Sequence, residues 1–322
     1  MPAPNRPHRR PSRSWRARGA LLLVACVGLL GACSNGAPSA ESAPDGLLAL
    51  VANANGTTLV GWDDSGDEPT SITLPKGETT WVDPGLAGVL AATLADGTTQ
   101  TSDPLHLGKK LKWRAVKAVG PNGDPDRGPD TFASWEPSGG RYATLSGDLA
   151  TGEDVRVVLI DPSVSTTFEI PLDRSVVAAP PAWIDKDRFV VVTGDAAEPT
   201  ATIVDAQTGE LSDGPAGARL IATSADGGRI ATMAGQGAPV VVRDTTAWLG
   251  DDGSSLASIE PAGDATTAIG FALDSTGQRL VIAWADHKGV VTLAIHDARA
   301  DWRRVAQPEI GPARGAVVSW MR

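Results

Sequence analysis

The chain has 322 residues, of which 42% are hydrophobic and 20% charged, and its formal net charge is -10. Six arginines and no acidic residue precede residue 33, so the remainder holds 22 basic against 38 acidic residues, a charge of -16. An acidic body of this kind argues against general binding to nucleic acid or to anionic lipid, because both require basic surface.

The first 32 residues have the features of a signal peptide. Arginines up to Arg18 form a positively charged segment, and residues 20–30 form an apolar run too short to span a bilayer comfortably. The tetrapeptide Leu30-Gly31-Ala32-Cys33 follows. It resembles the lipobox of bacterial lipoproteins, which implies that residues 1–32 are removed and that Cys33 is thioether-linked to diacylglycerol. The alternative is an ordinary secretory peptide with an incidental cysteine.

Cysteine usage agrees with this interpretation. Cys26 and Cys33 are the only cysteines in the sequence, and Cys26 lies inside the segment expected to be removed. A free thiol would therefore be lacking in the mature body, which excludes disulfides, cysteine-ligated zinc and a cysteine nucleophile. We expect no cofactor and a fold held together by packing alone.

Residues 33–45 are interpreted as a flexible, lipid-anchored tether. Between Cys33 and Gly46 there is no large apolar side chain, so the segment has nothing to bury in a core. A random coil of about a dozen residues reaches about 20 Å. The globular body, residues 46–322, is thus expected close to a membrane surface but not embedded in it.

The body consists of short runs of β-branched, aliphatic and aromatic residues bounded by Gly, Pro, Asp or Ser. Such runs predict strands of antiparallel meanders, and repeated four-stranded meanders form the blades of a β-propeller. In chain order the predicted strands are 47–51, 57–62 and 71–74; 80–82, 88–94, 98–107 and 111–119; 131–135, 141–145, 155–160 and 165–172; 181–183, 188–193, 200–205 and a weak strand at 210–211; 220–223, 229–234, 239–244 and 256–259; and 267–271, 278–284, 290–295 and 302–306.

One predicted strand, 316–320, remains at the end of the chain, whereas the first set has only three strands. Its ending Val318-Ser319-Trp320 matches Ala133-Ser134-Trp135, the end of the innermost strand in another set. We therefore predict an all-β, six-bladed β-propeller of four-stranded antiparallel blades, in which the C-terminal strand joins the N-terminal blade as its innermost strand. Closing the ring would remove long unpaired strand edges.

The segment Trp135-Glu136-Pro137-Ser138-Gly139-Gly140-Arg141-Tyr142-Ala143 resembles the blade signature of TolB-type, WD-repeat-like propellers. Weaker copies occur at 224–231 and 273–280, and the copies near Trp81 and Trp183 depart further. In this signature the glycine permits the positive φ of a tight hairpin, and the tryptophan caps the apolar layer between blades. A lipidated N-terminus beside a propeller is also similar to actinobacterial lipoproteins. The family spans scaffolds, binding modules and enzymes, so fold analogy does not assign a function.

Motifs for catalysis are lacking in the sequence. It has no Gly-x-Ser-x-Gly elbow, no His-Glu-x-x-His segment and no phosphate loop or dinucleotide fingerprint. The body's histidines, His106, His287 and His296, fall in different predicted strands or loops, so surface or strand-filling roles are favoured over catalysis.

Two acidic loops, 63–68 and 122–126 with the nearby Asp130, offer oxygen ligands of the kind that calcium requires. Neither matches the twelve-residue calcium-loop pattern, and Pro125 restricts the second, so hydrophilic loops are favoured and no metal site is assigned.

The segments that lead into the innermost strands would gather at one mouth of the central channel, where propellers commonly bind ligands. They carry Lys76, Asp130, Arg174, Arg219 and Arg314. Four basic residues near one mouth would attract an anionic ligand or a carboxylate-bearing partner. The alternative is scattered, solvated charges.

These features predict a monomeric lipoprotein, anchored at the extracytoplasmic face of the cell membrane. Its propeller would be a non-catalytic binding or scaffolding module for an envelope protein, peptide or glycan. The alternative is an extracytoplasmic hydrolase or lyase whose catalytic residues lie on separate blades and leave no local motif.

Overall fold

The computed structural model describes residues 46–54, 56–62, 69–116, 130–149, 151–163, 166–172, 174–195 and 197–321. The expected signal peptide, Cys33 and the tether lie outside these residues, as do the acidic loops 63–68 and 122–126. Among the described residues, none of the helices is long and apolar enough to cross a membrane.

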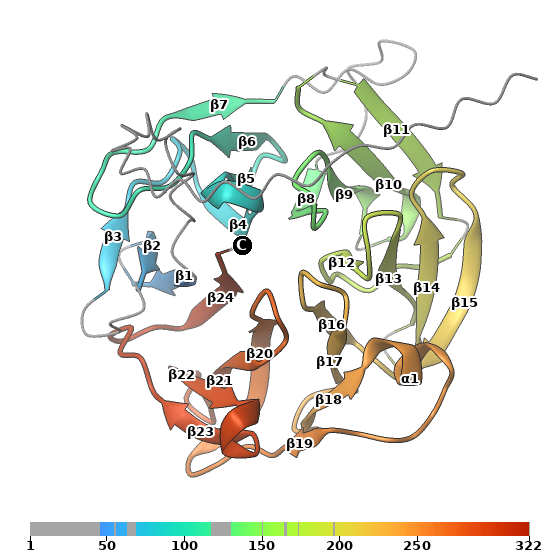
Figure 1. Cartoon of the computed structure of the whole chain (residues 1–322). Coiled ribbons are helices and arrows are strands. Elements are labelled where there is room, and N and C mark those ends of the chain that lie inside the picture. The colour runs from blue at the N-terminus through green and yellow to red at the C-terminus, as the bar shows by residue number, and fades with distance from the viewer. Residues whose placement is uncertain are drawn as a thin grey trace, which may run out of the picture. The chain divides into compact units, whose positions relative to one another are not determined.

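Six four-stranded antiparallel sheets, here called blades 1 to 6, stand in a ring around a common centre (Figure 1). Every predicted strand has a counterpart in these sheets. Within blades 2 to 6 the chain runs from the innermost strand outward, whereas blade 1 takes its innermost strand from the end of the chain. The predicted six-bladed β-propeller is therefore confirmed.

The strand bounds, from the innermost strand outward, are as follows. Blade 1 has β24 (Gly315–Trp320), β1 (Leu47–Asn53), β2 (Gly56–Gly61) and β3 (Thr70–Ile72); blade 2 has β4 (Thr79–Pro84), β5 (Leu90–Leu94), β6 (Thr99–Ser102) and β7 (Trp113–Ala115); blade 3 has β8 (Asp130–Trp135), β9 (Tyr142–Asp148), β10 (Glu153–Asp161) and β11 (Thr166–Pro171); blade 4 has β12 (Ala182–Trp183), β13 (Arg188–Gly194), β14 (Pro199–Asp205) and β15 (Leu211–Ala216); blade 5 has β16 (Leu220–Thr223), β17 (Arg229–Met233), β18 (Val240–Asp244) and β19 (Ala257–Ile259); blade 6 has β20 (Ala265–Leu273), β21 (Arg279–Asp286), β22 (Val291–Asp297) and β23 (Arg303–Ala306).

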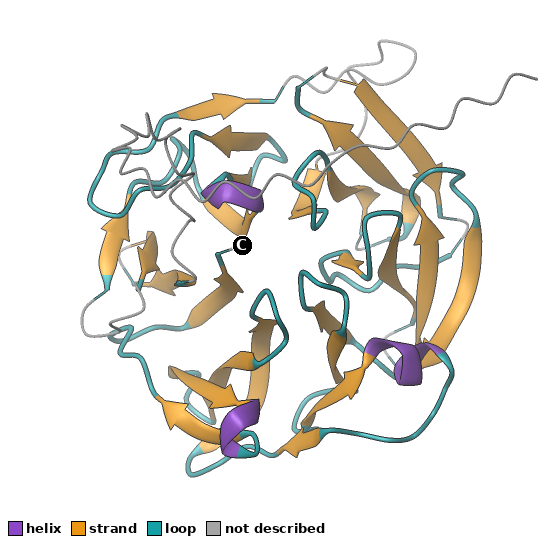
Figure 2. Ribbon diagram, viewed as in Figure 1, coloured by secondary structure: helices purple, strands orange, loops and turns teal. Residues whose placement is uncertain are grey.

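Strands dominate this body, and the helical pieces within the described residues are short (Figure 2). They are the 3-10 turns η1 (Leu86–Gly88) and η2 (Ala298–Ala300) and the helix α1 (Thr245–Leu249). The sequence does not predict them, since pieces of three to five residues are too short to show a helical period. In blade 2 the predicted strand 98–107 was too long, because β6 ends at Ser102.

The ring closes by pairing of β24 with β1. The two strands are antiparallel, with Trp320 opposite Leu47 and Gly315 opposite Ala52. Beyond the last pair, the N–H of Met321 donates to the carbonyl of Gly46 at 2.8 Å. The C-terminal strand thus completes the N-terminal blade as predicted.

Each blade buries both of its faces. In β1, Leu47, Ala49 and Val51 pack against blade 6, whereas Leu48 and Leu50 pack against blade 2. Successive side chains of a strand point to opposite faces, so a strand between two neighbours must be apolar throughout. Six such clusters of buried residues fill the six spaces between blades.

The glycine of the signature turn is required for two reasons. Gly139, Gly227 and Gly277 have φ values of 73°, 70° and 66°, which a residue with a Cβ rarely adopts. A Cβ on Gly139 would also lie 2.6 Å from the Cβ of Leu86, and one on Gly277 would lie 2.8 Å from the Cβ of Arg229. The turn of one blade therefore packs directly against the preceding blade.

An arginine follows the signature turn and links neighbouring blades. Arg141 of blade 3 donates to the carbonyls of Lys186 and Ala206, at 2.9 and 3.2 Å, and its guanidinium lies 5.7 Å from the ring of Trp183. Arg229 similarly donates to the carbonyl of Gly277 at 3.1 Å. These contacts tie blade 3 to blade 4 and blade 5 to blade 6.

The register of β4 corrects the comparison of Trp81 with Trp135. Trp135 pairs with Tyr142 as the last residue of β8, and the corresponding residue of β4 is Pro84, which pairs with Leu90. Trp81 lies three positions earlier in the strand. Trp183, in contrast, does occupy the position of Trp135, because it ends β12.

We predict that deleting residues 315–322 abolishes cooperative unfolding or causes aggregation. The deletion removes β24, exposes an edge of β1 and opens the packed spaces on both sides of blade 1. Thermal denaturation followed by circular dichroism, with light scattering, measures this. A truncated chain that melts like the intact one would contradict the closure described here.

Candidate functional site

The innermost strands β4, β8, β12, β16, β20 and β24 stand around the centre of the ring (Figure 1), which is here called the channel. Two small cavities lie along it, with volumes of about 70 and 60 Å³. The larger one lies where the strands end and is here called the turn-side cavity; the other lies toward the strand starts and is called the strand-start cavity. They are adjacent, because they share the lining residues Trp81, Pro180, Ile221, Phe271 and Val318.

The turn-side cavity is lined by one equivalent residue from every blade, the last but one of each innermost strand. In blades 4, 5 and 6 this residue is alanine, and in blades 1, 2 and 3 it carries oxygen. The six residues are Ser319, Asp83, Ser134, Ala182, Ala222 and Ala272 in the order of the blades. Because blades 1 to 3 are neighbours, the oxygen-bearing side chains lie on one half of the channel wall.

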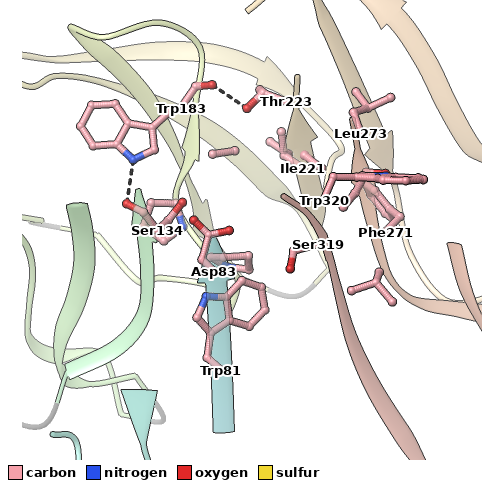
Figure 3. A pocket seen from close by; sticks show the side chains of 16 residues that line it. Trp81, Asp83, Ser134, Trp183, Ile221, Thr223, Phe271, Leu273, Ser319 and Trp320 are labelled. Atoms are coloured by element: carbon pink, nitrogen blue, oxygen red, sulfur yellow. Dashed lines mark hydrogen bonds between the residues drawn. The ribbon is translucent and has the colours of Figure 1, made fainter. Parts of the chain in front are cut away.

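Asp83 is the single charged residue among the sixteen that line the turn-side cavity. Its side chain is buried, with 7% of the residue exposed, and Oδ2 accepts a hydrogen bond from the N–H of Trp135 at 2.8 Å. Ser134 and Ser319 are similarly buried. Figure 3 shows these three residues around the same space, each on a different strand.

Tryptophans form part of the same wall and join neighbouring blades. The indole N–H groups of Trp81, Trp183 and Trp320 donate to the carbonyls of Ala133, Ser134 and Ala272, at 3.0, 2.9 and 3.1 Å. Thr223 adds a bond of 2.5 Å to the carbonyl of Trp183 (Figure 3). The indole N–H groups are therefore occupied, and the channel wall is held in place from blade to blade.

The residues predicted for the basic mouth lie elsewhere than in these two cavities, since none of them lines either one. Arg219 and Arg314 come nearest, because they precede Leu220 and Ala316 of the strand-start cavity by one and two residues. Lys76 is exposed, ahead of β4, whereas Asp130 is buried as the first residue of β8.

Arg174 lies away from the channel. Its Nη1 forms an ion pair of 2.5 Å with Asp213, which belongs to β15, the outermost strand of blade 4. Arg174 also lines a peripheral cavity of about 520 Å³ together with the ion-paired Arg156 and Glu169. The structure thus separates Arg174 from the other basic residues of the predicted mouth.

The histidines are dispersed as well. His106 and His287 are exposed in loops of blades 2 and 6, and none of the three histidines lines a channel cavity. His296 is buried in β22, where its Nδ1 lies 2.9 Å from the carbonyl oxygen of Trp302. Within the described residues, no three His, Cys, Asp or Glu side chains are grouped to hold a metal.

Sequence reasoning missed Asp83 as a channel residue. A signal was present, since Val82-Asp83-Pro84 aligns with Ala133-Ser134-Trp135 once Pro84 is recognised as the end of the strand. Aligning Trp81 with Trp135 shifted the comparison of the two strands by three residues.

We predict that His296 makes stability fall as pH drops through about 6.5. Burial lowers the pKa of His296 below its ordinary value, and the charge of Arg304 adds to this effect. The unfolded chain therefore binds a proton that the folded chain does not, so the free energy of unfolding decreases below that pH. Urea denaturation between pH 5 and 8 measures the slope, which His296→Gln should reduce and the exposed His287→Gln should not. Equal slopes for both variants would contradict the assignment.

The comparisons with known proteins are structural. Neither a family model nor a curated protein matches the sequence. The fold is similar to TolB from Acinetobacter baumannii, with a TM-score of 0.61 and 14% identity over 86% of this chain and 66% of the TolB chain.

Two further solved structures are similar. A puromycin hydrolase S511A mutant complexed with PGG has a TM-score of 0.51 and 17% identity, covering 84% of this chain and 53% of that one. The β-propeller domain of Cps50 (Swd1) from Myceliophteria thermophila has a TM-score of 0.50 and 12% identity, covering 76% and 77%. At these identities the likeness shows the fold alone: a β-propeller like that of TolB.

Proposed function

We propose that this chain is an extracytoplasmic lipoprotein, anchored through Cys33, whose propeller is a non-catalytic binding or scaffolding module in the cell envelope. The observation that carries the proposal is the channel itself. Residues from all six blades line one cavity there, and blades 1 to 3 contribute a carboxylate and two hydroxyls to it. The fold shared with TolB and with the Cps50 propeller domain supports a binding or scaffolding role.

Binding would rely on a rigid frame. Every space between blades holds a packed cluster, and side chains such as Trp183 and Arg141 bond across the boundaries. A preorganised surface loses little conformational freedom when a partner binds, which favours affinity. The lipid on Cys33 would hold this frame, as a monomer, near the membrane surface.

The partner proposed for the strand-start side is an envelope protein, peptide or glycan with anionic groups. Arg219 and Arg314 adjoin the strand-start cavity, and Lys76 is exposed ahead of β4. Cations around an apolar opening attract carboxylates and steer their approach. Arg174, with Asp130, belonged to the same sequence prediction, but its pairing with Asp213 makes it the weakest candidate of the group.

An extracytoplasmic hydrolase or lyase is the second proposal, suggested by the puromycin hydrolase among the similar structures. It would require catalytic groups drawn from separate blades. The capture experiment below separates the two proposals, since a binding module should retain a partner without consuming it.

We predict that Cys33→Ala abolishes lipid attachment. Without the thiol there is no thioether to diacylglycerol, so labelling with a radioactive fatty acid should be lost and the protein should move from the detergent phase to the aqueous phase. Cys26→Ala is the matched control, because it also removes one thiol yet lies in the segment expected to be cleaved. Labelling of Cys33→Ala at the wild-type level would reject the anchor.

We predict that a triple variant, Lys76→Gln, Arg219→Gln and Arg314→Gln, binds its partner with at least about tenfold lower affinity and keeps its stability. Charges at the rim of an interface govern the rate of encounter and the electrostatic complementarity. The measurement is affinity capture from native membranes in mild detergent, followed by mass spectrometry and titration of the partner found. The matched control is Arg303→Gln with Arg304→Gln, which removes exposed charges on the outermost strand β23. Equal retention by both variants would reject the basic mouth, and no partner at all would favour a small ligand or an enzyme.

A further inference from the structure

A further cavity, here called the inter-blade cavity, lies between blades 4 and 5 and has a volume of about 310 Å³. It shares no lining residue with the two channel cavities. Its walls come from β15 of blade 4, from β17 and β18 of blade 5, and from α1 with the loop that follows it. The helix α1 packs beside β15 and β18 (Figure 1). Binding sites for small molecules measure about 300 to 1,000 Å³, so this cavity has the size for a small metabolite.

Arg243, on β18, brings a positive charge to the inter-blade cavity. It is half-buried, and its Nη1 donates to the hydroxyl of Thr232 at 3.0 Å. That hydroxyl is its only side-chain partner in the part of the chain that the structure describes. In contrast, Arg141, Arg156 and Arg174 each pair with a carboxylate. A guanidinium has five N–H donors and can hold a carboxylate through two parallel hydrogen bonds. Arg243 therefore has donors left for an anionic group of a ligand.

Asp251 and Asp252, in the loop that follows α1, bring negative charge to the same cavity. The N–H of Asp251 donates to the carbonyl of Trp248 at 3.1 Å, which ties the loop to the helix. Asp252 accepts a hydrogen bond from the N–H of Ser254 at 2.9 Å through Oδ1. Neither carboxylate forms an ion pair with Arg243, and all three are described residues. The cavity thus holds a positive and a negative group that do not neutralise each other.

The rest of the lining is mostly apolar, and most of its side chains are small. The small residues are Pro215, Ala216, Ala218, Ala234, Ala238 and Pro239. Trp248 adds a large ring, which is 5% exposed and packs in the buried cluster between blades 4 and 5. Small side chains leave space for a ligand, and an aromatic ring offers it a large contact area. An aliphatic group of a ligand would therefore be removed from water here.

The combination of charges favours a zwitterion over a simple ion. A ligand with only a carboxylate would meet Arg243 but also two aspartates, and a ligand with only an ammonium group would meet the aspartates but also Arg243. Like charges repel, so each of these ligands would lose part of what it gains. An α-amino acid carries a carboxylate and an ammonium group on one carbon atom. It therefore offers an acceptor to the guanidinium and donors to the aspartates at the same time.

We propose that the inter-blade cavity binds a free α-amino acid with a small aliphatic side chain. Its carboxylate binds Arg243, its ammonium group binds Asp251 and Asp252, and its side chain lies against Trp248. This site goes beyond the proposed function, because it uses neither the channel nor the basic residues predicted for its mouth. It also does not depend on lipid attachment at Cys33.

The test is equilibrium dialysis of the full chain in mild detergent against radiolabelled L-leucine and L-alanine. Two analogues of L-leucine each lack one charged group: 3-methylbutylammonium lacks the carboxylate, and 4-methylpentanoate lacks the ammonium group. We expect L-leucine to bind at a single saturable site. In competition with L-leucine, each analogue should bind at least about tenfold more weakly, because it loses a charge-assisted hydrogen bond and still meets a like charge.

The first variant is Arg243→Gln, which removes the positive charge and retains an N–H donor. It should weaken L-leucine binding at least about tenfold, because the carboxylate loses its charged partner. It should not weaken the binding of 3-methylbutylammonium, since the amine then meets no like charge. The matched control is Arg303→Gln, which removes an exposed charge on β23 and should leave L-leucine binding unchanged.

The second variant, Asp251→Asn with Asp252→Asn, remains informative if Arg243→Gln unfolds, since both aspartates are exposed. It should weaken L-leucine binding severalfold, a smaller effect because water screens exposed charges. Asp264→Asn is its matched control, because Asp264 is exposed and lies outside the cavity lining. Three results would overturn the proposal: no binding of L-leucine or L-alanine at about 10 mM, an analogue that binds as tightly as L-leucine, or undiminished L-leucine binding by either variant in its folded state.

Discussion

The pairing of β24 with β1 is the constraint on which the rest of the body depends. It joins the two ends of the propeller through six residue pairs, from Leu47–Trp320 to Ala52–Gly315. Without it, blades 1 and 6 would each lose a packed neighbour and two long edges would be open. The same strand also supplies Val318, Ser319 and Trp320 to the turn-side cavity. Closure of the ring and completion of the candidate site are therefore one event, so a chain that fails to close can neither fold stably nor bind in its channel.

Closure alone would not fix the channel wall, because strands around an open centre can slide or tilt. The turn glycines and the tryptophans limit that freedom. Gly277 brings the turn of blade 6 against Arg229 of blade 5, and Trp183 bonds across to blade 3. Each blade is thus positioned by its neighbours at the level of the cavity. A wall made in this way is ordered before a ligand arrives, which favours recognition of small groups over adaptation to large ones.

The sequence predicted the architecture well because strands buried on both faces are distinctive. Runs such as Leu47 to Val51 are apolar at every position, and the ending Val318-Ser319-Trp320 repeats Ala133-Ser134-Trp135 closely enough to reveal the closing strand. The site was harder, since it depends on register. Trp81 was aligned with the signature tryptophan, so the sequence comparison did not single out Asp83. Arg174 pairs with Asp213, which lies 39 residues further along the chain. Local patterns carry no information on such pairings.

The polar residues around the channel are unevenly distributed among the blades. If the last-but-one position served only to pack the ring, one residue type would suit all six blades, as alanine does in blades 4 to 6. Instead a carboxylate and two hydroxyls occupy three adjacent blades. A buried carboxylate requires hydrogen bonds or charges around it, and Asp83 accepts one such bond from the N–H of Trp135. Asp83 therefore gives one half of the channel wall a charged group that the alanine-lined half lacks.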